Sequence, residues 1–126
     1  MKKFIALILL GLSLTLSSVV FADELSTLRV VMVDTDDAAA YAAQLNQGSQ
    51  LIKAVVPKMT IRAWRATFAG DSTGTIIVGV EYPGTLADFA TAWEKVQADQ
   101  SVAKWLAGLA GLRKVVSDSL YSEIAI

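Results

Sequence analysis

The hydrophobic pattern predicts a strand and then a helix in the first part of the chain. Residues 28–33 form a β-branched run too short for a helix, which predicts a strand. Residues 36–55 carry residues at spacings of three and four that indicate one buried helical face, namely Tyr41, Leu45, Gly48, Ile52 and Val55. Acidic residues at the start suit a helix N-terminus, and Pro57 stops the helix.

The middle of the chain predicts an antiparallel hairpin. Residues 60–69 and 75–82 both alternate, and the turn-forming residues 70–74 separate them. The second strand has one fully apolar face, which consists of Ile76, Val78, Val80 and Tyr82. We expect this face to pack against the helices.

The last third predicts a two-part helix and a final strand. Thr85 and Asp88 are spaced as a capping box, so a helix begins at residue 86. The helix restarts near residues 99–101, and residues 114–124 alternate as a strand. Trp93 and Trp105 lie on the apolar stripes of the two helical segments, which favours core packing over ligand contact.

The resulting order, strand-helix-strand-strand-helix-strand, predicts an α+β fold of the ferredoxin-like type. Its four-stranded antiparallel sheet carries the helices on one face. The chain shows no internal linker or low-complexity stretch between residues 23 and 126, so these residues form one domain.

Residues 1–22 have the pattern of a cleavable signal peptide. Lys2 and Lys3 precede an apolar run, and Val20 and Ala22 stand three and one before the expected cut. The run is shorter than a membrane span, and the chain has no cysteine for lipidation. We therefore expect a periplasmic or secreted protein with no membrane anchor after cleavage.

The sheet face away from the helices is too apolar to face water. It holds Ile77 and Gly79, with Trp64 and Phe68 expected beside them. An apolar patch of this size is typical of an interface or a ligand site. A homodimer with its two sheets packed face to face would bury the patch.

This arrangement resembles the dimeric α+β barrel proteins, which include antibiotic-biosynthesis monooxygenases and NIPSNAP-like proteins. The resemblance rests on the element order, the hairpin end Glu81-Tyr82-Pro83, the helix interruption at 98–100 before Trp105, and the closing Val115-Val116-Ser117 strand. It implies a homodimer with a cavity between sheet and helices or between the two sheets. The haem-degrading members use a His ligand, which this chain lacks.

The candidate cavity-lining residues lie on the uncovered sheet face, and they are Arg62, Trp64, Phe68, Ile77, Glu81 and Tyr121. Arg62 could hold an anionic or phenolate substrate, while Glu81 or Tyr121 could move a proton. The structural alternative, which we favour, is an ion pair between Arg62 and Glu81 across the hairpin, with Trp64 filling the interface.

Composition narrows the function further. The chain has no His and no Cys, which excludes His- or Cys-dependent nucleophilic catalysis and His/Cys metal or haem sites. The net charge of -1 argues against nucleic-acid binding. We expect no cofactor. The sequence favours an exported homodimer that binds a small apolar or aromatic molecule or only assembles. The first alternative is a cofactor-independent monooxygenase or isomerase acting on an aromatic or phenolic substrate, and the second is a structural partner of another envelope protein.

Overall fold

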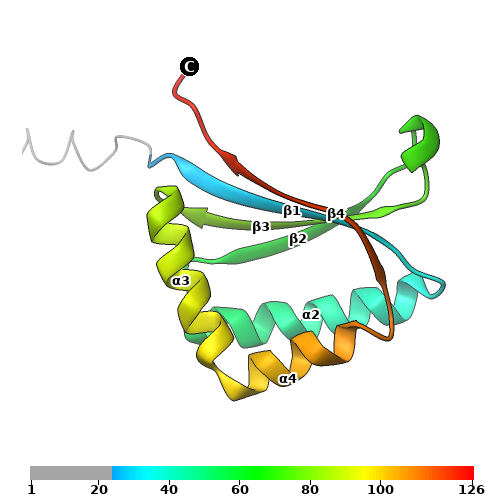
Figure 1. Ribbon diagram of the computed structural model, residues 1–126, viewed down its shortest axis with the longest axis horizontal. Coiled ribbons are helices and arrows are strands. Elements are labelled where there is room, and N and C mark those ends of the chain that lie inside the picture. The colour runs from blue at the N-terminus through cyan, green and yellow to red at the C-terminus, as the bar shows by residue number, and fades with distance from the viewer. Residues whose placement is uncertain (1–23) are drawn as a thin grey trace, which may run out of the picture.

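The computed structural model describes residues 24–126, which form one four-stranded sheet with helices on one of its faces (Figure 1). The predicted signal peptide lies outside the described residues. The elements in chain order are β1 (Ser26–Asp34), α2 (Ala38–Val55), β2 (Thr60–Arg65), the 3-10 turn η1 (Gly70–Ser72), β3 (Ile76–Pro83), α3 (Leu86–Ala98), α4 (Gln100–Leu109) and β4 (Lys114–Ser122). This order confirms the predicted ferredoxin-like α+β fold.

The strands lie in the order β2-β3-β1-β4, and every neighbouring pair is antiparallel. β1 and β3 are the central strands, while β2 and β4 form the two edges. The register places Val31 opposite Val78, and Ala63 of β2 opposite the same Val78. These residues therefore share the face that the helices cover.

A β-bulge changes the predicted alternation in β4. Met32 pairs with Ser117, but the next residue, Val33, pairs with Val115, so Val116 is the extra residue. Strict alternation along residues 114–124 predicts Val115 on the same face as Tyr121. The bulge instead turns Val115 toward the helices, together with the fully buried Val33.

Each helix begins at a residue that the sequence marks as a cap. The side chain of Asp37 accepts a hydrogen bond from the backbone N–H of Ala40 at the start of α2. Thr85 and Asp88 form the predicted capping box of α3, and their hydrogen bonds hold the pKa of the Asp88 carboxyl below its usual value. Asp99 ends α3 and caps α4, which explains the predicted interruption.

The core lies between the helices and the inner sheet face. Its largest fully buried side chains include Tyr41 and Ile52 of α2 and Leu109 of α4. The predicted stripe of α2 is confirmed. In α3 the spacing of three and four predicts a buried stripe of Leu86, Phe89, Trp93 and Val96, and this prediction is wrong for Leu86, which is half exposed at the first turn of the helix.

β2 is shorter than predicted. It ends at Arg65 because Ala66 already exchanges hydrogen bonds with Gly74 and Thr75, which closes the connection to β3. Phe68 therefore lies in the loop rather than on the strand, and its side chain is fully exposed.

A glycine in α2 allows α4 to pack closely against it. A Cβ atom built on Gly48 would lie 1.9 Å from Cζ2 of Trp105. The Trp105 indole N–H donates to the backbone carbonyl of Gln44, one turn earlier in α2, at 2.8 Å. The tryptophan is thus held over the glycine by a specific hydrogen bond.

We expect Gly48→Ala to destabilise the fold by about 1–3 kcal/mol, because the added methyl displaces Trp105 from a well-packed position. The matched control is Gly108→Ala in α4, where a Cβ would meet no atom within 4 Å. The control should be neutral or stabilising by up to about 1 kcal/mol, as expected for glycine replacement in a helix. Urea unfolding measures both, and equal stability of the two variants would contradict the packing role of Gly48.

Candidate functional site

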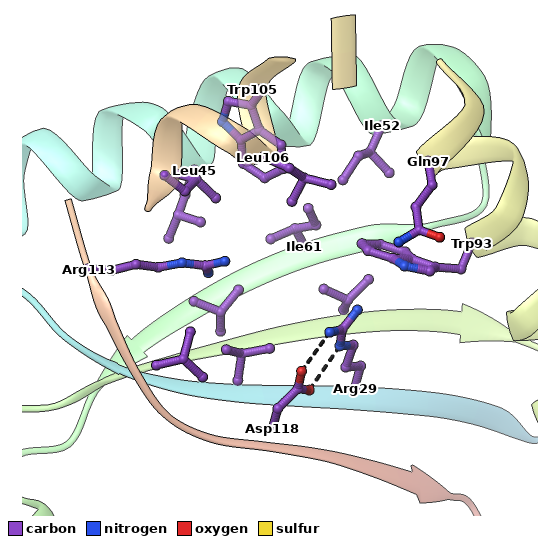
Figure 2. Close-up of a pocket in the computed structure, with 15 residues that line it drawn as sticks. Arg29, Leu45, Ile52, Ile61, Trp93, Gln97, Trp105, Leu106, Arg113 and Asp118 are labelled. Atoms are coloured by element: carbon purple, nitrogen blue, oxygen red, sulfur yellow. Dashed lines mark hydrogen bonds and ion pairs between the residues drawn. The ribbon is translucent and has the colours of Figure 1, made fainter. Parts of the chain in front are cut away.

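A cavity of about 180 Å³ lies between the inner sheet face and the helices. Its apolar wall on the sheet side consists of Val31, Ile61, Val78, Val80 and Val115. Its wall on the helix side consists of Leu45, Ile52, Trp93, Trp105, Leu106 and Leu109 (Figure 2). The remaining lining residues are polar, and they are Arg29, Gln97, Arg113 and Asp118. The cavity is therefore an apolar chamber with a few polar groups, the usual character of a small-molecule site.

Arg29 and Asp118 form a two-pronged ion pair beside this cavity. The Arg29 Nε donates to Asp118 Oδ1 at 2.9 Å, and Nη2 donates to Oδ2 at 2.6 Å (Figure 2). Arg29 comes from the central strand β1 and Asp118 from the edge strand β4. Both point to the helix side of the sheet, since Arg29 pairs with the buried Val80 and Asp118 with the buried Val31.

The pair keeps both groups charged. The hydrogen bonds from Arg29 are the main reason why the pKa of the Asp118 carboxyl is held below its usual value, and the charge of Arg113 also lowers it. The same hydrogen bonds raise the pKa of Arg29. Asp118 is therefore ionised at neutral pH, and its charge is matched by Arg29.

Aromatic rings flank the ion pair. The guanidinium carbon of Arg29 lies 5.0 Å from the ring centroid of Trp93, within cation-π range. On its own helix, Trp93 stacks with Phe89 at 6.2 Å between centroids. These contacts fix Trp93, which the sequence predicted to be core, as part of the cavity wall.

Arg113 supplies a second guanidinium to the cavity. It lies just before β4, and Figure 2 shows its side chain extending between α2 and the sheet toward the chamber. Its Nη1 donates to the hydroxyl of the buried Tyr41 at 3.1 Å. This hydrogen bond fixes one end of the Arg113 fork.

An adjoining groove runs between α3 and β4. Arg29, Trp93 and Asp118 line both the groove and the cavity, so they form the boundary between the two spaces. Leu120 of β4 and the half-exposed Leu86 line the groove only. The groove therefore borders the cavity along the edge strand.

The residues that the sequence named as cavity-lining do not line this chamber. Trp64, Ile77, Glu81 and Tyr121 lie on the opposite sheet face, as their strand register shows, and Arg62 lies with them. Phe68 is apart from the others, in the loop after β2. Their proposed role, in a space between two packed sheets, stays a prediction.

The expected ion pair between Arg62 and Glu81 is wrong. Arg62 pairs with Gly79 and Glu81 with Thr60, so the two are not opposite each other. The Arg62 guanidinium instead lies 5.9 Å from the centroid of the Trp64 ring. Within residues 24–126, the single ion pair is that between Arg29 and Asp118.

Sequence reasoning missed Arg29, Asp118 and Arg113, although one signal was present. Arg29 alternates with Val31 and Val33 in β1, so it falls on the buried side of a strand. An arginine in such a position needs a partner, because burial of an unpaired charge is costly. A search for an acidic residue on the same face of another strand would have reached Asp118.

Two further features bear on chemistry. Among the described residues, no group of three or more His, Cys, Asp or Glu side chains is placed to hold a metal ion. No helix in that part of the chain has the length and hydropathy needed to span a membrane.

Comparisons with known proteins bear on the fold. The sequence matches no protein-family model and no curated protein sequence. A NIPSNAP family protein of unknown function from Agrobacterium tumefaciens superposes with a TM-score of 0.61 at 12% identity, over 82% of this chain and 90% of that one. SnoaB, a cofactor-independent oxygenase from Streptomyces nogalater, superposes with a TM-score of 0.60 at 12% identity, over 80% of this chain and 95% of that one. The chain therefore has the ferredoxin-like α+β fold of these proteins, as the sequence resemblance predicted.

Proposed function

We propose that the protein binds a small aromatic molecule in the cavity between its sheet and helices. The observation that carries this proposal is the chamber itself, walled by two tryptophans and aliphatic side chains with polar groups at its margins. Its volume of about 180 Å³ is close to that of an engineered apolar cavity, about 150 Å³, that holds benzene. A molecule of one or two rings is the matching class.

The three tryptophans allow a direct test of where an aromatic molecule binds. Trp93 and Trp105 line the cavity, whereas Trp64 lies on the other sheet face. Titration with naphthalene derivatives should shift the indole N–H resonances of Trp93 and Trp105 in NMR spectra and leave Trp64 unchanged. Leu106→Trp should fill the chamber and weaken binding by about tenfold or more.

The control for this substitution is Ala103→Trp, which adds the same ring at an exposed position of the same helix. It should leave the affinity unchanged. Indole shifts confined to Trp64, or equal affinity of the Leu106→Trp variant and the wild type, would contradict binding in the cavity.

We further propose that the protein is a homodimer that packs through its uncovered sheet face. Apolar residues from all four strands lie on that face, namely Leu28, Val30, Met32, Trp64, Ile77 and Tyr121. Trp64 and Tyr121 are more than half exposed. Gly79 lets the Trp64 ring lie flat across the sheet, since a Cβ there would come within 3.1 Å of Cζ3 of that ring. A flat apolar face of this kind suits a two-fold partner sheet.

Val30→Glu should convert the dimer to a monomer, because Val30 lies on a central strand of this face and two-fold packing would bring the two carboxylates into an apolar interface. Ala43→Glu, at an exposed position on α2, is the control and should remain dimeric. Sedimentation velocity measures the mass, and circular dichroism checks the fold. A wild-type monomer at micromolar concentration would overturn the proposal.

A cofactor-independent oxygenase is the second candidate. It is favoured by the structural likeness to SnoaB, which has that activity, and by a cavity lined by two guanidinium groups, of which that of Arg29 lies beside Trp93. A nearby cation favours the ionised form of a phenolic substrate. Such an electron-rich ring can reduce O₂ itself, taking one oxygen atom into the product and releasing the other as water. We place this activity, like ligand binding, in the periplasm or outside the cell, as the signal pattern indicates.

If the protein is such an oxygenase, oxygen uptake with one- and two-ring hydroquinones should fall at least about tenfold in the Leu106→Trp variant, because the substrate is excluded from the cavity. Tyr121 lies on the other sheet face, so Tyr121→Phe should leave the rate unchanged. An oxygen electrode and product mass spectrometry provide the measurement. A rate that falls with Tyr121→Phe and not with Leu106→Trp would place the chemistry on the other face of the sheet.

A further inference from the structure

The cavity has one positive charge more than it has negative charges. Its lining includes two guanidinium groups, on Arg29 and Arg113, and a single carboxylate, on Asp118. Both Asp118 oxygens accept hydrogen bonds from Arg29, at 2.9 and 2.6 Å. No carboxylate of the described chain forms an ion pair with Arg113.

Arg113 therefore has unused capacity to bind an anion. A guanidinium carries five N–H donors in a planar fork, and the described contacts of Arg113 use one of them, on Tyr41. That contact is to a neutral hydroxyl, so it holds the side chain in place without matching its charge. A carboxylate or phenolate would receive a charge-assisted hydrogen bond from the remaining donors.

The polar groups of the chamber are also poor in free acceptors. Asp118 is occupied by Arg29, so among the cavity-lining side chains only the amide oxygen of Gln97, an exposed residue of α3, is an acceptor without a described hydrogen bond. In Figure 2, Arg113 and the pair of Trp93 and Arg29 lie at opposite ends of the chamber, with apolar side chains between them. A ligand with rings in the middle and an anionic oxygen group at one end matches this distribution.

We propose that the ligand is an aromatic molecule with one anionic oxygen group, a carboxylate or an ionised phenol, and that Arg113 is the residue that selects it. This inference rests on the proposed binding function and adds the ligand's charge. Arg29 is not the main selecting group because its charge is already matched by Asp118 in a two-pronged ion pair. Arg113 is thus the specificity-determining residue of the cavity.

The test compares 2-naphthoate with its neutral counterpart 2-naphthamide, which has the same rings and nearly the same shape. Isothermal titration calorimetry at neutral pH should show 2-naphthoate binding about 10- to 100-fold more tightly to the wild-type protein, as expected for a charge-assisted hydrogen bond in a partly buried site. Arg113→Met should remove this preference and leave the affinity for 2-naphthamide nearly unchanged. Arg113→Lys should keep part of the preference because it keeps the charge.

The control is Lys114→Gln, which removes one positive charge from the next residue, exposed and outside the cavity lining. It should keep the full preference. 4-Nitrophenol distinguishes the two anionic groups: if the site takes phenolates, binding should shift its absorbance toward the ionised form in the wild type and not in Arg113→Met. A carboxylate-selective site would prefer 2-naphthoate without this shift.

The outcomes separate the inference from the function on which it rests. If no probe binds the wild-type protein, the binding function itself fails. If 2-naphthoate and 2-naphthamide bind equally well, the cavity is a binding site but the inferred charge selection is overturned. The wild-type ratio decides this even if Arg113→Met fails to fold, and a Lys114→Gln variant that loses the preference would assign the effect to overall charge rather than to Arg113.

Discussion

The four-stranded sheet has two faces, and the helices cover only one of them. The core on one face and the exposed apolar side chains on the other both follow from this unequal coverage. On the inner face, the valines of β1 and β3 pack against Tyr41, Ile52 and Leu109, which supplies the core of the domain. On the outer face, apolar side chains are left in water unless a second sheet packs on them. Alternation along a strand assigns consecutive residues to these two environments, so Leu28 and Arg29 face opposite layers although they are neighbours in sequence.

The inner layer does not close completely, and the reason lies at the edge strand. β4 is largely exposed, whereas the opposite edge strand, β2, packs against α2. Arg29 and Asp118 occupy the gap where an apolar pair would otherwise have to face solvent. An ion pair tolerates partial exposure, and both groups of this pair remain partly exposed to solvent.

The sequence predicted the architecture well because the signals for architecture are local. Helix stripes, the capping box at Thr85 and the break at Asp99 each depend on residues a few positions apart. The cavity depends on distant pairs instead: Arg29 and Asp118 are 89 residues apart, and Tyr41 and Arg113 are 72 apart. The bulge at Val116 is likewise set by how two strands pair. The apolar character of the uncovered face was predictable because it follows from the alternation within the hairpin alone.

A fold of this kind supports binding proteins and enzymes alike, so the activity is determined by the side chains of the site. At 12% identity to the solved structures, the side chains of a site are not inherited with the backbone. This chain places three features in its own cavity: aromatic walls, one matched charge pair and one unmatched guanidinium. The aromatic walls favour a ring, the charge pair forms the boundary of the cavity, and the unmatched guanidinium favours an anion. A binding site and an oxygenase site would both use these groups, and they would differ only in whether the bound ring is electron-rich enough to react with O₂.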